Sequence, residues 1–439
     1  MLTDLSAAQP PQQTDARPQT TVALMPCGFL FEDFFDTVNI SFETFRTELT
    51  GGWMFNYIDA LKLAGIRTVL FFVSARVNAP WHFIHEPTGA TVWVLPGPKR
   101  HREFRQFHRR IKLPGKRFIN SLDAYLILPL TPLAELLQQE NCQAILFQDY
   151  ERPGFDLSVF LGRGLNLPVF ATFQGGRPSR NPIEQLIRRV ALRFCAGLVI
   201  ASQTEIDRVK QDYHLPPAKI AQIFNPMDVM NWQSVDQTAA RQALNLPLDA
   251  RIVITHGRID IVQKGLDILL QAWKQICTAR PDQNLCLLLV GTGKDSPVLR
   301  QQIVELQLTN IVWVDEYVRD RTLLWQYISA ADIYVLASRH EGFPVAPVEA
   351  MTCGLPVVAA NAPGVADILA GGEASGGLIV PCEDSAALAQ ALERLLDDKT
   401  LRHQLGQRAR QRAEAYFSLE AIGKQLSGFL NLTDSISHF

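Results

Sequence analysis

The chain has 439 residues, of which 47% are apolar and 20% charged, and its formal net charge at pH 7 is -2. This composition is that of a soluble globular protein, the length favours two domains over one core, and the small net charge gives no global attraction to nucleic acid. Seven scattered cysteines without a C-x-x-C pair argue against a disulfide framework or a zinc site and favour a reducing, cytoplasmic compartment. No apolar run reaches the ~18 residues that a membrane-spanning helix needs.

The beginning of the chain predicts a tail, a strand and a glycine turn. Residues 1–20 are rich in Pro, Gln and Thr and lack an apolar stretch, so we expect a disordered tail and not a signal peptide. The apolar residues 21–25 predict the first strand of a sheet. Gly51 and Gly52 stand before a helical pattern over 57–64, where glycines would let the backbone approach a phosphate or an acceptor.

Two segments of the first half stand out by composition. Residues 29–36 mix Phe with Asp and Glu; we expect the aromatic side chains to pack in the core, with a lid or an acceptor wall as the alternative. Residues 99–118 are rich in Lys and Arg, and Phe104, Phe107 and Ile111 recur there at helical spacing. Such a basic amphipathic helix fits an anionic membrane surface or an anionic acceptor. It equally fits a solvated helix whose aromatic side chains lie in the core.

The rest of the first half predicts further strands of one sheet, which are the apolar runs at 68–73, 91–95, 141–149, 167–173 and 196–201. Gln174 follows one of these strands. Its amide can hydrogen-bond a sugar but cannot carry a proton. Pro226 fixes a rigid, non-helical joint after the last strand. We therefore place the first domain at 21–226 and begin the second near residue 229.

The second half alternates strands with helices, which predicts a parallel α/β sheet. The strands are expected at 252–255, 285–290, 311–314, 333–336, 355–360 and 376–381. The helices are expected at 266–276, 385–396, 400–417 and 418–430. Arg258 and Lys264 follow the first of these strands in a loop that opens a helix. Two cations beside a helix start suit a diphosphate, although for these two residues alone ordinary surface charge is the better explanation. Gly291-Thr-Gly293 lacks the third glycine of a dinucleotide fingerprint and is weak evidence for NAD.

The most informative segment is 338–368. A loop over 338–345 follows an apolar strand and opens a helix that ends at Gly354, so loop and helix start lie at the carboxyl end of the strand. Open α/β sheets bind ligands there, and free N–H groups at a helix start favour a phosphate. Glu341 lies in the loop and Glu349 in the first helical turn, where both fit as acceptors for sugar or ribose hydroxyls. Two solvated glutamates are the plain alternative.

Two blocks of this half resemble family 4 retaining glycosyltransferases. Glu341-Gly-Phe-Pro, then Glu349 and Ala-Met-x-x-Gly-x-Pro-Val-Val, is similar to the family's E-x7-E motif. His-Gly-Arg at 256–258, followed by Lys-Gly-Leu-Asp and Leu-Leu-x-Ala within 264–272, is similar to its G-R-x(n)-K-G-x-D-x-L-L-x-A segment. Gln174 departs from the family, many members of which have a histidine there.

The resemblance implies the GT-B fold, an α/β architecture in which two Rossmann-like, doubly wound domains face each other across a cleft. The first domain, 21–226, would bind the acceptor and would be completed by a terminal helix within 418–439. The second domain, 229–417, would bind the nucleotide-sugar.

The resemblance also implies an activity and a set of site residues. The enzyme would be a retaining, metal-independent, hexosyltransferase-like transferase that moves a sugar from a nucleotide-diphosphate donor to an acceptor hydroxyl. Arg258 and Lys264 would neutralise charge on the diphosphate, Glu341 would hold the transferred sugar, and Glu349 would bind the ribose hydroxyls. The other expected donor-binding residues are Gly257, Tyr317, Val318, Gly342, Phe343, Pro344 and Val345, and the expected acceptor or phosphate loop residues are Gly51, Gly52 and Gln174.

These expectations include no cofactor and no metal. The donor would be a nucleotide-sugar, with a UDP-sugar favoured, and the acceptor a glycan, a lipid-linked molecule or a small molecule. We expect no nucleic acid partner, and a cytoplasmic protein whose residues 99–118 fit the inner face of a membrane. Two alternatives stay open: another GT-B enzyme, such as a nucleotide-sugar epimerase or a phosphorylase, and a non-catalytic GT-B scaffold protein.

Overall fold

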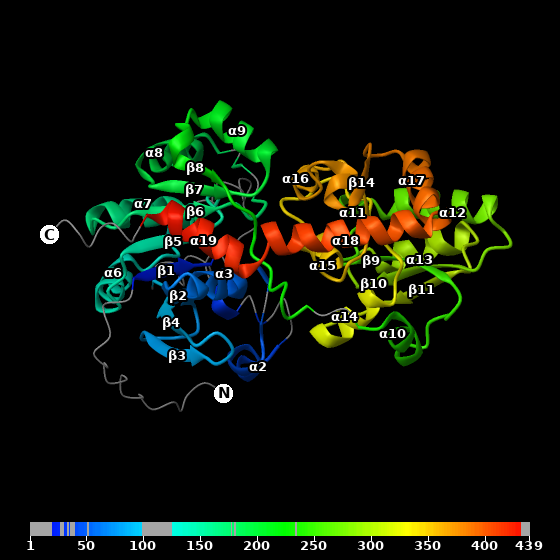
Figure 1. Cartoon of the computed structure of the whole chain (residues 1–439). Helices are drawn as coiled ribbons and strands as arrows, with labels where there is room; N and C mark the ends of the chain where they lie inside the picture. Colours follow the sequence, from blue (N-terminus) through cyan, green and yellow to red (C-terminus); the bar gives the residue numbers. More distant parts are fainter. Residues whose placement is uncertain are drawn as a thin grey trace, which may run out of the picture. The chain divides into compact units, whose positions relative to one another are not determined.

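The computed structural model describes residues 20–26, 30–32, 35, 40–50, 52–98, 125–176, 178–179, 181–232 and 235–431 (Figure 1). The expectations for the tail before residue 20, for Gly51 and for the basic stretch 99–118 lie outside these residues. The chain divides into two compact units. The first runs to Ile200 and adds Ile206–Ile223 and the chain from Gly423 on, and the second holds Ala201–Glu205 and Phe224–Ile422.

The first unit is built on one sheet of eight strands in the order β3-β4-β2-β1-β5-β6-β7-β8. All neighbouring strands are parallel except β3 and β4, which are antiparallel. The strands are β1 (Thr21–Met25), β2 (Arg67–Ser74), β3 (Trp81–His85), β4 (Ala90–Pro96), β5 (Ala144–Gln148), β6 (Val169–Thr172), β7 (Gly197–Ile200) and β8 (Ile220–Gln222). The sequence predicts six of these runs and misses the short edge strands β3 and β8, which are only partly buried.

Helices cover this sheet, and one of them comes from the end of the chain. They are α2 (Phe42–Thr47), α3 (Gly52–Leu63), α6 (Leu130–Gln139), α7 (Pro153–Gly164), α8 (Pro182–Phe194), α9 (Gln203–Tyr213), a 3-10 turn at Pro217–Lys219, and α19 (Leu419–Leu430). Gly423 of α19 lies so close to α3 that a Cβ atom there would come within 2.1 Å of the Ala60 carbonyl oxygen. Further along α19, Phe429 packs edge-on against Phe170 of β6. The terminal helix is thus part of the first unit's core.

An aromatic cluster lies beside β2 and β3 in the first unit. Phe31 is buried and packs against the rings of Phe45, Phe72 and Phe83 at centroid distances between 4.9 and 6.2 Å. The prediction that the aromatic residues of 29–36 pack in the core is therefore confirmed for Phe31. Because these rings occupy the interior, nothing at Phe31 supports the alternative of a lid.

His85 ends β3 inside the same cluster. Its ring is fully buried and stacks on Phe55 with centroids 4.2 Å apart. Nε2 lies 2.9 Å from the carbonyl oxygen of Leu49, which can only accept, so Nε2 carries the proton. Nδ1, 2.8 Å from Thr88 Oγ1, then accepts from that hydroxyl. Burial lowers the pKa of His85 to about 4, against the weaker upward effect of its backbone hydrogen bonds.

We expect the free energy of unfolding to fall as the pH is lowered from about 6.5 to 4, because of the buried neutral ring of His85. An unfolded histidine has a pKa of ~6.5, so between these values the unfolded chain binds a proton that the folded chain does not. The stability contributed by neutral His85 is complete above pH ~6.5 and is lost on acidification, by about 3 kcal/mol in total. Urea unfolding of the His85→Phe variant should show a shallower pH dependence than wild type, whereas His82→Phe on the same strand should not. Equal slopes in all three proteins would contradict this assignment.

The second unit contains a sheet of six parallel strands in the order β11-β10-β9-β12-β13-β14. The strands are β9 (Arg251–His256), β10 (Leu285–Val290), β11 (Ile311–Val314), β12 (Ile333–Leu336), β13 (Val357–Ala360) and β14 (Gly377–Val380). Successive residues alternate between two cores: Ile252 and Ile254 belong to one, and Val253 to the other. Because both faces are covered, the strands are continuous apolar runs, which is why the sequence locates all six.

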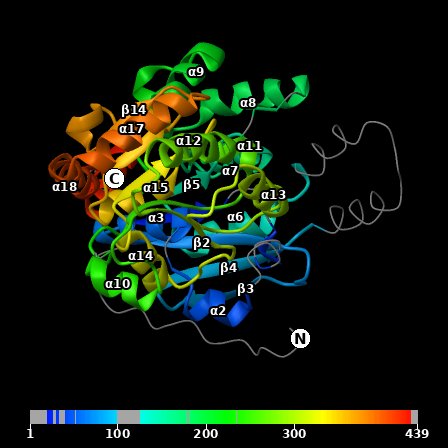
Figure 2. The same ribbon diagram turned by 90° about the vertical axis from the view of Figure 1, so that its right-hand side faces the viewer.

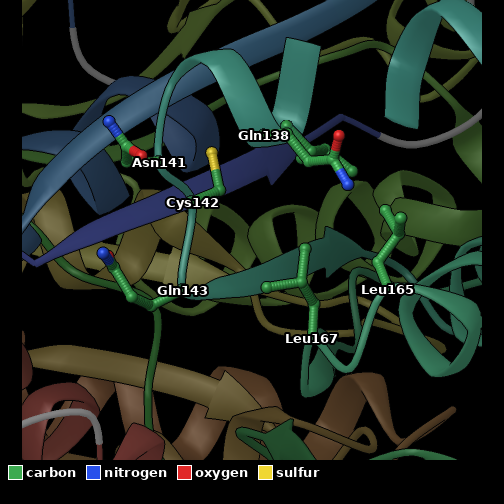
Figure 3. Close-up of a pocket in the computed structure, with 7 residues that line it drawn as sticks. Gln138, Asn141, Cys142, Gln143, Leu165 and Leu167 are labelled. Carbon is green, nitrogen blue, oxygen red and sulfur yellow. The ribbon is translucent and has the colours of Figure 1, made fainter. Parts of the chain in front are cut away.

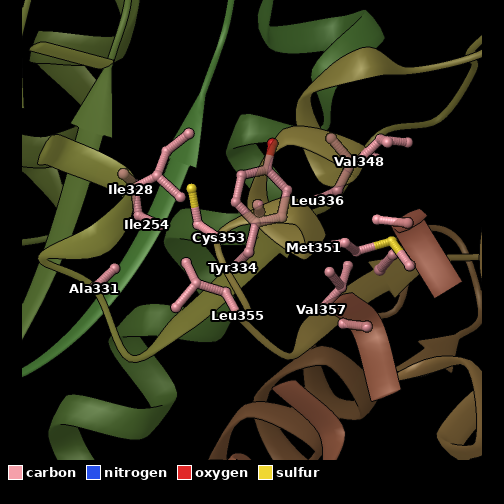
Figure 4. Close-up of a cluster of buried hydrophobic side chains, with 14 of the residues drawn as sticks. Ile254, Ile328, Ala331, Tyr334, Leu336, Val348, Met351, Cys353, Leu355 and Val357 are labelled. Atoms are coloured by element: carbon pink, nitrogen blue, oxygen red, sulfur yellow. The ribbon is translucent and has the colours of Figure 1, made fainter. Parts of the chain in front are cut away.

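The helices of this unit pack on both faces of the sheet. They are α10 (Gln237–Ala243), α11 (Ile261–Lys264), α12 (Leu266–Ala279), α13 (Ser296–Glu305), α14 (Arg321–Ser329), α15 (Val345–Thr352), α16 (Val365–Ile368), a 3-10 turn at Gly372–Ser375, α17 (Ser385–Asp397) and α18 (Lys399–Tyr416). Figure 4 shows Tyr334 and Leu336 of β12 with Val348 and Met351 of α15 in one of the two cores. In the described part of the chain, no helix combines the length and the apolar character needed to cross a membrane.

Two sequence-based placements in this unit are wrong. Lys264 is not in a loop but ends the short helix α11, which begins after the N-cap residue Asp260. Glu349 is not in the first turn of its helix, because α15 already begins at Val345 and has no acidic residue in its first turn. Glu349 therefore lies beyond the first turn, within which the effect of the helix dipole falls off.

Candidate functional site

The candidate site lies at the carboxyl ends of β9 and β12, which are neighbours in the second sheet. From β9 the chain moves outward through β10 to β11, and from β12 it moves the other way through β13 to β14. The strand order therefore reverses between β9 and β12. Open α/β sheets bind ligands at such a switch point, where the loops on the two sides diverge and leave a crevice. The segments that follow these strands, which are 257–265 with the short helix α11 and 337–344, are called the two site loops below, and they carry most of the donor-site residues expected from the sequence.

Glycines hold these loops in close contact. Gly265 has φ 60°, and a Cβ atom there would lie 2.0 Å from the carbonyl oxygen of Ala337. Gly364, with φ 81°, approaches the Gly342 carbonyl oxygen in the same way, at 2.3 Å. The Gly291-Thr-Gly293 turn has the same explanation, because Gly291 would meet the Gly257 carbonyl oxygen at 2.0 Å. These glycines pack loop against loop and need no dinucleotide to account for them.

Lys264 and Glu341 form an ion pair across the two loops. Lys264 Nζ donates to Glu341 Oε1 at 2.7 Å, and Ser338 Oγ donates to the same oxygen at 2.6 Å. Glu341 is buried and Ser338 fully so, whereas Lys264 is about one-fifth exposed. From the sequence, Lys264 was expected to bind the diphosphate and Glu341 to bind the transferred sugar, with no contact predicted between them. The structure brings them together, so the carboxylate is neutralised before any anion arrives.

Glu349 makes a second contact between the two sides of the site. Its Oε2 atom lies 2.8 Å from Nε2 of His256, the last residue of β9. His256 is nearly buried, and its Nδ1 atom has no hydrogen-bond partner among the described residues. His256 was part of the motif quoted from the sequence, but its contact with Glu349 was missed. Glu349 is about 15% exposed, so part of its side chain reaches solvent.

A small cavity of about 20 Å³ lies beside these residues and is lined by Thr255, His256, Gly257, Arg258, Ile259, Lys264, Leu266, Leu289, Val290 and Leu336. Arg258 and Gly257 are exposed at its rim. Arg258 donates from Nη2 to Gln263 Oε1 at 2.9 Å and pairs with no carboxylate in the described part of the chain. Of the two expected cations, Arg258 is therefore the one whose charge faces solvent.

Arg339 fixes the turn that carries Lys264. Its guanidinium donates to both carboxylate oxygens of Asp267 at 2.8 Å, to the Val262 carbonyl at 3.0 Å, and to Glu383. Burial acts to raise the pKa of Asp267, but the hydrogen bonds and charge of Arg339 outweigh it and hold that pKa below its usual range. The sequence analysis gave Arg339 no role. The quoted Lys-Gly-Leu-Asp block contains its partner Asp267, but nothing in the local sequence links that residue to Arg339.

The other expected donor-site residues fall into two groups. Phe343 packs against Phe224 and Phe417, and Pro344 is the N-cap residue of α15, so both have structural roles in the loop. Gly342 and Val345 flank them and are partly exposed. After β11, Tyr317 is two-thirds exposed, and Val318 is half-buried and packs against one of the two cores.

The expected acceptor residues lie in the first unit. α3 begins at Gly52, and Gln174 follows β6, where its amide donates to Thr172 Oγ1 at 3.0 Å. A mainly apolar cavity of about 110 Å³ opens at the carboxyl ends of β1, β2 and β5, and Arg152 is its charged lining residue. This is the edge of a parallel sheet at which ligands bind.

A larger hollow of about 360 Å³ in the same unit is lined by Leu137, Gln138, Asn141, Cys142, Gln143, Leu165 and Leu167 (Figure 3). Gln143 and Leu167 precede β5 and β6, so this hollow is at the amino ends of the strands. It lies at the wrong edge of the sheet for a ligand site of this fold.

The described residues contain no group of three or more His, Cys, Asp or Glu side chains placed to hold a metal ion. Residues 236–412 match the family model of glycosyl transferases group 1. The match covers residues 236–412 of 439, so the similarity to group 1 glycosyltransferases holds for this segment of the second unit. The match agrees with the resemblance expected from the two sequence blocks, both of which lie within the matched residues.

Curated relatives match about half of the chain. The chain is 30% identical over 237 residues to a D-inositol 3-phosphate glycosyltransferase of Corynebacterium urealyticum, which covers 52% of this chain and 55% of that protein. It is 28% identical over 224 residues to a GDP-mannose-dependent monoacylated alpha-(1-6)-phosphatidylinositol monomannoside mannosyltransferase of Corynebacterium glutamicum, covering 49% and 55%. The chain thus spans about half the length of the curated relatives that it matches.

Solved structures match the whole fold. Sucrose-phosphate synthase from Thermosynechococcus elongatus aligns with a TM-score of 0.68 at 22% identity, covering 95% of this chain and 100% of that one. Anabaena Alr3699/HepE, in complex with UDP, aligns with a TM-score of 0.69 at 18% identity, covering 94% and 99%. These neighbours and the two parallel α/β sheets confirm the predicted GT-B fold of two Rossmann-like domains.

Proposed function

We propose that the protein is a glycosyltransferase that moves a sugar from a nucleotide-diphosphate-sugar to an acceptor hydroxyl, with retention of the anomeric configuration. One observation carries this proposal. The Lys264–Glu341 and His256–Glu349 pairs meet at the switch point of a sheet within a group 1 glycosyltransferase domain. Together they place cations for a diphosphate and carboxylates for hydroxyl groups in one crevice.

The diphosphate is proposed to lie between Arg258 and the start of α15. Arg258 is exposed and free of carboxylate partners in the described residues, and the helix start offers unpaired N–H groups. Lys264 adds a second cation while remaining paired with Glu341. Because charge grows on the diphosphate as the anomeric bond loosens, fixed cations there stabilise the transition state more than the ground state.

Glu349 is proposed to accept hydrogen bonds from the ribose, and Glu341 to orient the transferred sugar. The contact between His256 Nε2 and Glu349 Oε2 orients the Glu349 carboxylate, and Oε1 is proposed to bind the ribose. For Glu341, the bonds from Lys264 and Ser338 both end on Oε1, which leaves Oε2 to the sugar.

Retention is proposed to proceed by substitution on one face of the sugar, in which the leaving phosphate helps to deprotonate the acceptor. Both site carboxylates already have partners that fix them, which suits binding better than nucleophilic attack. We further propose that the reaction needs no metal and that the protein is cytoplasmic. Activity that survives EDTA would support the first proposal, and strict dependence on a divalent cation would contradict it.

For the donor we favour a UDP-sugar, because the Anabaena neighbour is known in complex with UDP and glucose; one curated relative is GDP-mannose-dependent. For the acceptor, names among the relatives include an inositol phosphate and a phosphatidylinositol mannoside. The apolar cavity in the first unit favours an acceptor with an apolar part, such as a lipid-linked alcohol.

The first test is thermal unfolding with UDP, GDP and ADP for wild type and for Glu349→Gln. A ligand at ~100 times its dissociation constant adds ~2.7 kcal/mol to the native state, which raises Tm by roughly 5–10 °C for a unit of this size. One nucleotide should do this for wild type and much less for the variant, which keeps the His256 contact but lacks the charge. Glu305→Gln, an exposed acid on α13, is the matched control. No shift with any nucleotide would favour a non-catalytic scaffold.

The second test follows the product. Transfer from the identified donor should give a glycoside whose anomeric coupling in proton NMR matches that of the donor sugar. An inverted product would contradict retention. Phosphate-dependent release of a sugar phosphate would identify a phosphorylase, and interconversion of free nucleotide-sugars an epimerase.

A further inference from the structure

Helix α8 (Pro182–Phe194) buries two of its four charged side chains. Glu184 and Arg188 are buried on the face toward α7, where Arg188 Nε lies 3.0 Å from the carboxylate of Asp156. Ser179 Oγ donates to Glu184 Oε2 at 2.7 Å. Only Ala191 and Leu192, near its end, join the apolar core. Polar contacts thus contribute much of the packing of α8, and several of its large apolar side chains remain exposed.

Those residues form one exposed row along the outer side of α8, which we call the α8 stripe: Ile183, Leu186, Val190 and Phe194. Their spacing of three and four residues puts them on one helix face. Leu186 is 64% exposed and Ile183 56%. Phe160 of the adjacent α7 is also exposed, and Arg163 lies 4.1 Å above the Phe194 ring. In Figures 1 and 2, α8 lies on the outside of its sheet between α7 and α9. A continuous exposed apolar row of this kind marks an interaction surface.

The border of the stripe is basic. Arg189 and Arg193 are exposed beside it. They line a pocket of about 520 Å³ whose other charged lining residues are Asp212 and Lys219. Lys219 is held by the carbonyl oxygens of Arg193 and Cys195. Asp212, the acidic lining residue, is paired with Arg208. The positive charges of Arg189 and Arg193 have no carboxylate partner among the described residues and face outward.

We propose that the α8 stripe and its basic border bind the surface of an anionic membrane, with α8 lying in the plane of the interface. Helices that bind in this way have a strongly apolar face, low overall hydrophobicity and Lys or Arg beside it. Leucine and phenylalanine enter the acyl boundary, while Arg189 and Arg193 remain at the level of the lipid phosphates. The charge complementarity favours this occupant over a second copy of the chain, which would bring the same arginines face to face. The inference does not depend on the proposed transferase activity.

Co-sedimentation of the full chain with vesicles tests the proposal. Binding to phosphatidylcholine vesicles with 30% phosphatidylglycerol is expected, with little binding to phosphatidylcholine alone. Leu186→Ser/Phe194→Ser should lower the partition coefficient at least ~10-fold, because two large apolar side chains no longer leave water. Leu63→Ser/Ile84→Ser is the matched control, since Leu63 is 64% exposed, like Leu186, and Ile84 47%, like Phe194 at 48%. The control should bind as wild type does.

The basic border is tested separately. Arg189→Gln/Arg193→Gln should weaken binding to the anionic vesicles and reduce its salt dependence, whereas Lys210→Gln on α9 should do neither. Circular dichroism and Tm establish that each variant is folded. Two results would overturn the proposal. One is vesicle binding that is absent, or that is unaffected by the stripe substitutions. The other is a change of oligomeric state on substituting the stripe, seen by light scattering, which would identify a second copy as its occupant.

Discussion

Replacing Lys264 by methionine should lower kcat/KM for sugar transfer by roughly 10²–10³-fold and destabilise the second unit by about 3 kcal/mol. The first effect follows if Lys264 stabilises charge on the leaving diphosphate, since loss of one fixed donor at a developing charge costs about that much. The second follows because the buried Glu341 carboxylate loses its cation and is left uncompensated. Activity against the identified donor and urea unfolding measure the two effects independently.

The double variant Lys264→Met/Glu341→Gln separates the two effects. Removing both charges relieves the unpaired buried carboxylate, so most of the lost stability should return. Activity should not return, because the diphosphate still lacks its cation. Lys294→Met removes a mostly exposed lysine that pairs with Asp260 in the same unit, and it should leave both quantities nearly unchanged. A double variant that regains activity together with stability would show that Lys264 acts only on the fold.

The part of this fold that follows from local sequence is the set of central strands. Leu285–Val290 is a run without polar residues because both of its faces are covered, and its predicted bounds coincide with β10. The edge strand Trp81–His85 was missed because most of its residues are only partly buried and its pairing with β4 depends on the turn between them. A pattern based on burial cannot show a strand that is barely buried.

The site was predicted as a set of residues but not as a set of contacts. Lys264 and Glu341 are 77 positions apart, and His256 and Glu349 are 93 apart. Each pair forms because β9 and β12 are neighbours, which is a property of the strand order and not of any local spacing. The quoted motifs gave the residues on each loop. Only the sheet shows that the carboxylate of one loop neutralises the cation of the other.

Misplacing Glu349 has a simple local cause. The sequence suggested that the loop extends to residue 345, but the extended Pro344 already serves as the N-cap. The helix therefore begins earlier, and Glu349 is its fifth residue. At that position the free N–H groups of the helix start do not orient its carboxylate, which is held by His256 instead.

Gly265→Ala should be among the most damaging single-methyl substitutions in this protein. The added Cβ would lie 2.0 Å from the backbone carbonyl oxygen of Ala337, and the residue would have to keep φ near 60°. The left-handed conformation alone costs about 1–2 kcal/mol. The clash adds to this because it involves backbone and not the end of a flexible side chain. We expect a total loss of at least ~3 kcal/mol, together with loss of nucleotide-induced stabilisation, because the clash would separate Lys264 from Glu341.

Gly354→Ala is the control that isolates the cost of backbone strain. Gly354 also has a positive φ, 77°, and lies in the same unit, but the nearest atom to its added Cβ is 4.0 Å away. It should lose only about 1 kcal/mol, or roughly 2–4 °C in Tm, and should keep its response to the nucleotide. If the two variants were equally stable and bound nucleotide equally well, the close contact between the loops after β9 and β12 would not be what holds the site together. A large difference would show that the site is built by packing one loop against the other, with Gly265 as the residue that permits it.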